Sequence, residues 1–109
     1  MLTDAMTRFL AEKALGWEPT GDEWRVLGMY PGRAFDYGHA STPDLASWEG
    51  FGLLLTALAK AGREPVIGHL LRPIEGWHVV IRSGGEALGP DPRVALALAA
   101  AKAYGYKEE

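Results

Sequence analysis

Two segments rich in strand-forming residues lie next to each other in the second half of the chain, and their spacing restricts the fold more than any other feature. They run from Pro65 to Arg72 and from Gly76 to Arg82, and the link that begins at Pro73 suits a tight turn. Strands joined so closely must run antiparallel, because a parallel crossover needs a dozen residues or more. The hairpin therefore argues against a doubly wound nucleotide-binding fold.

The register of this hairpin decides which side chains face the core. A turn centred in the middle of the link would pair Arg72 with Trp77 and His69 with Val80. The expected core row is Val66, Leu70, Trp77, Val79 and Ile81, and the expected outer row is His69, Leu71, His78, Val80 and Arg82. A slip of one residue would invert this assignment.

Three segments have the apolar spacing of helices. The first covers residues 2–14, and the third covers residues 94–103 after an Asp91-Pro92 start. The second runs to Gly62 and opens at Thr42, which we expect to be its N-cap because proline follows it and Asp44 faces the positive helix end. A short strand is predicted over residues 24–30, and residues 83–90 are predicted to be a loop or a fraying edge.

The order helix, strand, helix, strand, strand, helix predicts an α+β fold. We expect a small antiparallel sheet of about three to four strands packed with three helices, in an α/β/α sandwich-like arrangement. The length of 109 residues predicts a single domain over residues 1–109.

Composition narrows the classes of function. The chain has no cysteine, which excludes disulfides, thiolate metal sites and a cysteine nucleophile, and its net charge of −3 with scattered basic residues argues against nucleic-acid binding. Apolar runs stay far below the ~20 residues of a membrane span, so we expect a soluble, cytoplasmic protein. The absence of asparagine and glutamine as well as cysteine suggests a thermophilic source.

Four segments together resemble a known family. They run from Leu10 to Glu18, from Ser41 to Trp48, from Trp77 to Ile81, and through the helix that begins Asp91-Pro-Arg-Val. These segments resemble the small phage and prophage "ABA sandwich" proteins, and the likeness covers nearly the whole chain. The chain departs from the family in a longer aromatic segment before Ser41 and in a more alanine-rich last helix. The resemblance implies a fold and a viral setting, and it assigns no catalytic residue and no cofactor.

The segment from residue 31 to residue 41 is the least regular part of the sequence and is predicted to be the longest loop. It mixes aromatic, acidic, basic and imidazole groups, as binding loops do. The candidate binding residues are Tyr30, Arg33, Asp36, Tyr37 and His39. They could contact a protein partner or hold a nucleotide or similar anion, for which Arg33 would supply the positive charge. Alternatively, the aromatic residues pin the loop to the body and the charged residues face water.

No arrangement of nucleophile and base indicates catalysis. Ser41, His39 and Asp36 lie too close in sequence for a catalytic triad, and no nucleophile elbow supports one. His69 and His78 could share a sheet face and ligate a metal with Glu75 or His39. We favour the interpretation that they are two half-exposed histidines, because no closely spaced ligand pair is present, and we predict no metal site and no cofactor.

The tryptophans and the strand edges suggest how the chain packs. Trp17, Trp48 and Trp77 fall on predicted core stripes, whereas Trp24 has no assigned role. Exposed strand edges favour self-association, so we expect a homodimer. The leading prediction is a phage or prophage accessory protein that binds a viral or host protein without catalysis. The alternative is a small-ligand protein with its site in residues 30–41.

Overall fold

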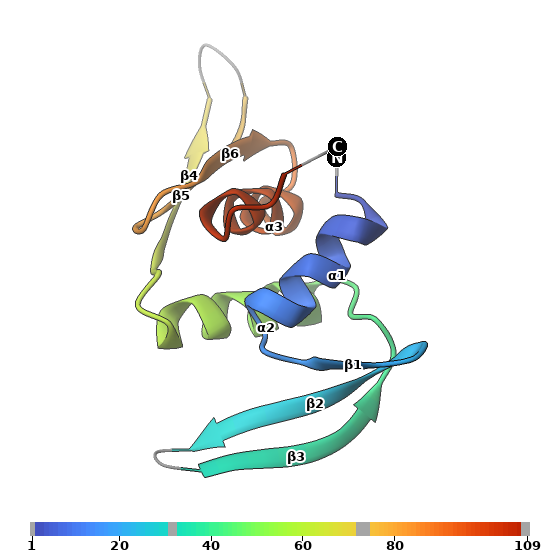
Figure 1. Cartoon of the computed structure of the whole chain (residues 1–109). Helices are drawn as coiled ribbons and strands as arrows, with labels where there is room; N and C mark the ends of the chain where they lie inside the picture. Colours follow the sequence, from blue (N-terminus) through green and yellow to red (C-terminus); the bar gives the residue numbers. More distant parts are fainter. Residues whose placement is uncertain (1, 31–32, 72–74, 108–109) are drawn as a thin grey trace.

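The computed structural model describes residues 2–30, 33–71 and 75–107. Its helices and strands, in order, are α1 (Asp4–Lys13), β1 (Glu18–Thr20), β2 (Glu23–Tyr30), β3 (Arg33–Ala40), α2 (Trp48–Lys60), β4 (Pro65–Leu70), β5 (Gly76–Ile81), β6 (Glu86–Gly89) and α3 (Pro92–Ala103). The strands form two antiparallel sheets, in the orders β1-β2-β3 and β4-β5-β6 (Figure 1). The α+β class is confirmed. The sequence did not predict the strands β1, β3 and β6 or the division into two sheets.

Helix α3 lies at the centre of the packed body, between the β4-β5-β6 sheet and the helices α1 and α2 (Figure 1). Its buried residues are Ala95, Leu96, Ala97, Ala99, Ala100 and Ala101. Small side chains allow the backbone of α3 to approach its neighbours closely on several sides. The layers therefore run from the sheet through α3 to α1 and α2, whereas the predicted sandwich has helices on both faces of one sheet.

The core is formed by side chains that converge on α3. The largest of the fully buried side chains are Leu10, Leu45, Leu54, Leu58, Val79, Ile81 and Leu96. They come from α1, the turn before α2, α2 itself, β5 and α3. The buried face of α2 does not include Trp48, which is 62% exposed, or Gly52, which is also exposed. The expectation that Trp48 is a core residue is therefore wrong.

The helix starts follow side-chain capping, although not everywhere as predicted. Asp91 Oδ1 accepts a hydrogen bond from the N–H of Arg93 (2.9 Å), which confirms the Asp91-Pro92 start of α3. Helix α2 begins later than predicted, because its N-cap is Ser47, whose Oγ accepts from the N–H of Gly50 (3.0 Å). The N-cap assignment of Thr42 is wrong, since residues 44–47 form a separate turn closed by a hydrogen bond from Ser47 N–H to the Asp44 carbonyl (3.2 Å).

The register of β4 with β5 differs from the predicted one. His69 lies opposite Trp77 and Leu70 lies opposite Gly76, which is a slip of three residues. Trp77, Val79 and Ile81 do face the core as expected. Val66 and Leu70, expected in the same row, are exposed on the other face, where Val66 is 70% exposed. An odd slip moves one strand's side chains to the opposite face, which explains the two errors.

The turn between β5 and β6 packs directly on α3. Gly85 has a φ of +115°, and a Cβ at this position would lie 2.6 Å from the carbonyl oxygen of Ala99. Only glycine suits both the backbone conformation and the close approach. The segment Ser83-Gly84-Gly85 is therefore the turn of the β5–β6 hairpin, within a stretch predicted to be a loop or a fraying edge. Residues 86–89, predicted to be a loop or fraying edge, form strand β6.

Strands β2 and β3 form a long hairpin, which we call the hairpin arm. The arm lies to one side of the helices, beyond α2, and its strands make their extensive contacts with each other and with β1 (Figure 1). Trp24 of β2 is only 3% exposed, and its Nε1–H donates to Thr42 Oγ1 at 3.0 Å. Trp24 therefore connects the first strand of the arm to the segment that follows its last strand.

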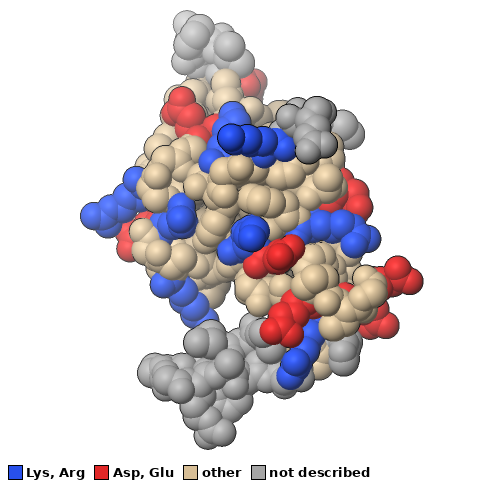
Figure 2. Space-filling view, viewed as in Figure 1, with Lys and Arg blue, Asp and Glu red and all other residues tan. Residues whose placement is uncertain are grey.

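Charged side chains of both signs are interspersed on the molecular face in Figure 2. Exposed ion pairs occur within a helix, as between Arg8 Nε and Asp4 Oδ2 at 2.9 Å, and between strands, as between Arg25 Nη1 and Glu18 Oε2 at 3.5 Å. Among the described residues, none of the helices is both long and apolar enough to cross a bilayer.

Candidate functional site

Where the structure describes it, the predicted binding segment consists mostly of strand and not of loop, and residues 31–32 lie outside the described residues. Tyr30 ends β2, and residues 33–40 form β3, with Trp24 opposite Ala40 and Gly28 opposite Phe35. The register shifts between Arg25 and Leu27, which marks an irregularity near the base of the arm. The side chains of the candidate residues lie outside the described part of the structure; these residues are Tyr30, Arg33, Asp36, Tyr37 and His39. Their assignment as binding residues stays a prediction.

A pocket of about 240 Å³ lies where the arm joins α2, and we call it the arm-foot pocket. Its lining residues are Trp17, Ala40, Ser41, Pro43, Asp44, Ser47, Glu49, Gly50 and Leu53. Among the described residues, the lining contains the carboxylates of Asp44 and Glu49 and no basic residue, so this part of the pocket suits a cationic group better than an anionic one. Ser41, which ends the predicted segment, belongs to this pocket.

The hydroxyl group of Ser47 in the arm-foot pocket binds to the backbone. Ser47 Oγ donates to the Asp44 carbonyl (2.6 Å) while it caps α2, and Asp44 Oδ1 accepts from the N–H of Ala46 (3.0 Å). The side chains that the structure describes in this lining include no histidine that could act as a base toward Ser41 or Ser47. The described lining therefore offers shape and negative charge, which suit binding, and no nucleophile paired with a base.

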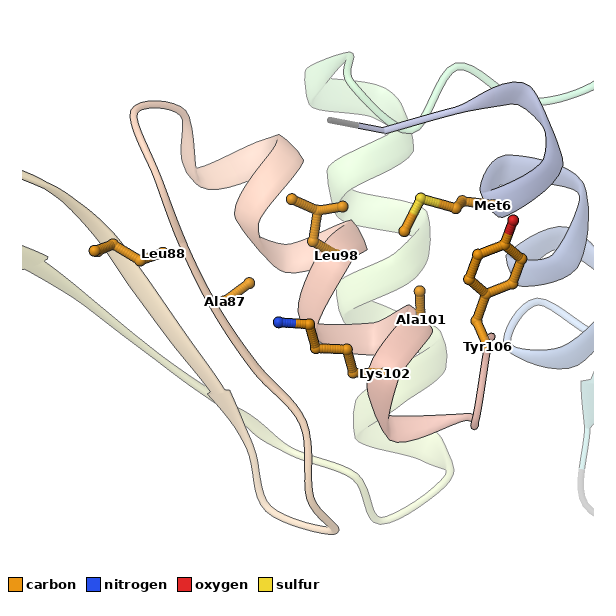
Figure 3. Close-up of a pocket in the computed structure, with 7 residues that line it drawn as sticks. All are labelled: Met6, Ala87, Leu88, Leu98, Ala101, Lys102 and Tyr106. Atoms are coloured by element: carbon orange, nitrogen blue, oxygen red, sulfur yellow. The ribbon is translucent and has the colours of Figure 1, made fainter. Parts of the chain in front are cut away.

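A second pocket, of about 470 Å³, lies between β6, α3 and the N-terminal helix (Figure 3). Figure 3 shows Met6 and Tyr106 on one side of this pocket and Ala87 and Leu88 on the other. Its lining residues are Met6, Ala87, Leu88, Leu98, Ala101, Lys102 and Tyr106. Lys102 Nζ donates to the carbonyl oxygen of Glu86 (3.0 Å), and Phe9 packs edge-on against the Tyr106 ring.

The second pocket has little chemistry beyond apolar contact. Lys102 and Tyr106 are its titratable groups, and the ammonium of Lys102 already bonds to the β6 backbone. Sequence reasoning missed this pocket because its walls come from α1, β6, α3 and the segment after α3. Periodicity cannot show that such distant segments meet, and small residues such as Ala87 and Ala101 are not distinctive in an alanine-rich chain.

The two histidines of the second sheet do not form a site together. His69 lies opposite Trp77 and stacks on its ring with centroids 4.8 Å apart, whereas His78 lies opposite Gly68 on the other face of the sheet. His78 Nε2 is 3.2 Å from Glu86 Oε2. The expectation that His69 and His78 share a face is wrong because of the three-residue slip. Among the described side chains, no group of three or more His, Asp or Glu could hold a metal ion.

Among the described side chains, a pair with shifted pKa values lies at the start of α3 and has a structural role. Arg93 Nη2 and Nε donate to the Asp91 carboxylate at 2.7 and 3.0 Å. These hydrogen bonds lower the pKa of Asp91 below its usual range, and the carboxylate raises the pKa of Arg93. The guanidinium of Arg93 also lies 4.6 Å above the Trp48 ring, which explains how this exposed tryptophan is held.

No protein-family model matches the chain, and no curated protein is significantly similar to it. The fold is similar to the 2.0 Å crystal structure of a phage protein from Bacillus cereus, with a TM-score of 0.61 and 17% sequence identity. The match covers 100% of this chain and 93% of that chain. At this level of identity, the similarity establishes a shared fold.

Proposed function

We propose that the chain is a phage or prophage accessory protein that acts in the host cytoplasm by binding a viral or host protein, without catalysis. One likeness supports the phage setting. The fold matches that of a phage protein over the whole chain. The described pockets also combine apolar lining with one sign of charge and no nucleophile–base pair, which favours binding over catalysis.

The observation that carries the proposal is the position of the hairpin arm. Its strands are eight residues long and lie outside the layers that surround α3 (Figure 1). A small sheet needs a second layer to bury one of its faces. The helices of this chain cover the β4-β5-β6 sheet instead, and a bound protein would supply the layer that the arm lacks.

The residues of the arm suit such a contact. Tyrosine and arginine carry a large share of the energy at protein interfaces, and the arm contains Tyr30, Arg33 and Tyr37. The acidic arm-foot pocket lies next to the last residue of β3 and would accept a lysine or arginine side chain of the partner. We therefore propose that the arm and the arm-foot pocket form one contact surface.

Affinity capture from phage-infected and uninfected host cells tests this function. The parent chain should retain one protein from the cells, and Arg33→Ala with Tyr37→Ala should lose it. Arg8→Ala is the matched control, because Arg8 is an exposed cation on α1, away from the arm. Circular dichroism would verify that all variants fold. Equal recovery by the parent and the double variant would reject the arm as the contact surface, and stabilisation by a nucleotide in a thermal-shift screen would favour the small-ligand alternative.

A further inference from the structure

We propose that β4 pairs antiparallel with β4 of a second copy of this chain, with Gly68 opposite Gly68 of that copy, so that the two three-stranded sheets join into one. This interface lies on the second sheet and is separate from the hairpin arm. It would make the chain a homodimer with two arms available for the proposed partner.

The two edges of the β4-β5-β6 sheet differ in how they are protected. The β6 edge is only four residues long and is followed by Pro90. The Glu86 carbonyl on that edge is occupied by the ammonium of Lys102. The β4 edge is six residues long and has no Lys, Arg, Asp or Glu from Pro65 to Leu70. An uncharged, exposed edge of this kind is a template for another strand.

The hydrogen-bonding direction of β4 is compatible with this pairing. The N–H of Arg82 donates to the Glu64 carbonyl (3.1 Å), so Glu64 and Arg82 form a hydrogen-bonded pair. Hydrogen-bonded and non-hydrogen-bonded pairs alternate along antiparallel strands. Even-numbered residues of β4 direct their backbone groups to β5, so Ile67 and His69 direct theirs to the open edge. Pairing centred on Gly68 places Ile67 opposite His69 of the second copy. The N–H and C=O groups of Ile67 can then bond to the C=O and N–H groups of His69 of the second copy.

The side chains of β4 are arranged symmetrically about Gly68, and this symmetry identifies the occupant as a second copy. Val66 and Leu70 lie two residues to either side of Gly68 on the uncovered face, and both are exposed. In the proposed register, Val66 of each copy lies beside Leu70 of the other, at the short distance of a non-hydrogen-bonded pair. One pairing therefore brings together exposed apolar residues from both copies.

Gly68 leaves the two-fold axis free of side chains in the proposed pairing. A Cβ at Gly68 would have no atom within 4 Å in this chain, so the glycine is not required by the fold of one copy. Beyond the central segment, Pro65 would lie opposite Leu71 of the second copy. Proline has no N–H to donate, so the ladder ends there, and its length is limited to the segment between Val66 and Leu70.

Disulfide trapping tests the register directly, since the chain has no cysteine of its own. Gly68→Cys places two thiols opposite each other and should form a covalent dimer rapidly under mild oxidation. Val66→Cys is the matched control, because its sulfur would lie beside Leu70 and not beside itself. Gly52→Cys, on the exposed side of α2, measures the rate of random collision. Equal cross-linking rates for the three variants would overturn the proposal.

Charged substitutions of Val66 and Leu70 test the same contact in solution, with the mass of the particle measured by sedimentation equilibrium. The parent should have twice the mass of one chain, and Val66→Lys with Leu70→Lys should be monomeric because like charges oppose each other. Val66→Lys with Leu70→Glu should restore the dimer, since each ammonium then faces a carboxylate. Leu88→Lys, on β6 of the same face, should leave the dimer unchanged. A monomeric parent, or equal dimer fractions in both double variants, would contradict the proposal.

Discussion

The hydroxyl of Ser47 determines where α2 begins, because it accepts the hydrogen bond from Gly50 N–H at 3.0 Å. Ser47→Ala removes that acceptor and should lower the free energy of unfolding by about 1 kcal/mol. Denaturant unfolding would show a lower midpoint with an unchanged slope. Ser41→Ala, at an exposed serine outside the helix, is the control and should leave the midpoint in place. A loss for Ser41→Ala equal to that for Ser47→Ala would contradict this capping role.

Thr42 holds the indole of Trp24, so its substitution should loosen the base of the hairpin arm. Thr42→Val removes the acceptor of the 3.0 Å hydrogen bond and leaves the Nε1–H of a buried tryptophan without its partner. We expect a loss of about 1–3 kcal/mol in unfolding free energy. Thr42→Ser keeps the hydroxyl and should retain most of that stability. Equal losses in the two variants would show that the methyl group of Thr42 matters more than its hydroxyl.

The carboxylate of Asp91 gives part of the stability a pH dependence. Arg93 lowers its pKa in the folded state, so the ionised carboxylate stabilises the fold above its unfolded-state pKa. That contribution is lost as the pH falls through the lower folded-state pKa. Asp91→Asn keeps an N-cap acceptor and removes the charge. The stability difference between the parent and Asp91→Asn should be present at neutral pH and vanish in acid; a pH-independent difference would contradict the assignment.

The sequence predicts the beginning of one helix correctly and of another wrongly. A polar residue before proline predicted the start of α3 correctly at Asp91 and the start of α2 wrongly at Thr42. In the second case, Asp44 closes a turn with Ala46 and Ser47 before the helix begins. The local signal is the same at both positions, but the Thr42 hydroxyl accepts a hydrogen bond from the Trp24 indole and does not cap the helix.

Two glycines of α2 should respond to alanine in opposite ways. A Cβ at Gly50 would overlap the carbonyl oxygen of Asp44 and lie 2.7 Å from the Cα of Leu45, so Gly50→Ala should destabilise the chain by about 3 kcal/mol. Gly52 is exposed with no atom within 4 Å of that position, and Gly52→Ala should stabilise α2 by about 0.5–1 kcal/mol. Thermal melts of both variants would check this contrast, and a shift of the same sign in both would contradict it.

The hairpin of β4 and β5 could be predicted from sequence, but its register could not. Apolar residues occur on both faces of β4, with Ile67 against the core and Val66 and Leu70 exposed. Alternation alone therefore does not select a face. In our proposal, Val66 and Leu70 are apolar because they contact the second copy. The same two apolar residues led to the wrong register in the sequence prediction.

The whole molecule separates into a body that packs around α3 and an arm that lies beside it. The sequence predicted the α+β class because the helical stripes and the hairpin are local signals. It predicted residues 31–41 as a loop because the segment contains proline, glycine and aspartate, which are depleted in strands. The strand forms through pairing with β2, as between Trp24 and Ala40, and such long-range pairing leaves little trace in the local sequence.

Amide hydrogen exchange of the chain, free and bound to the captured partner, would show whether the partner covers the hairpin arm. We expect binding to slow exchange in residues 25–41, which include the arm and the start of the arm-foot pocket. Residues of the second pocket, such as Met6 and Leu98, should exchange at the same rate in both samples. Slower exchange around Met6 and Leu98, with residues 25–41 unchanged, would contradict the proposal that the arm is the binding surface.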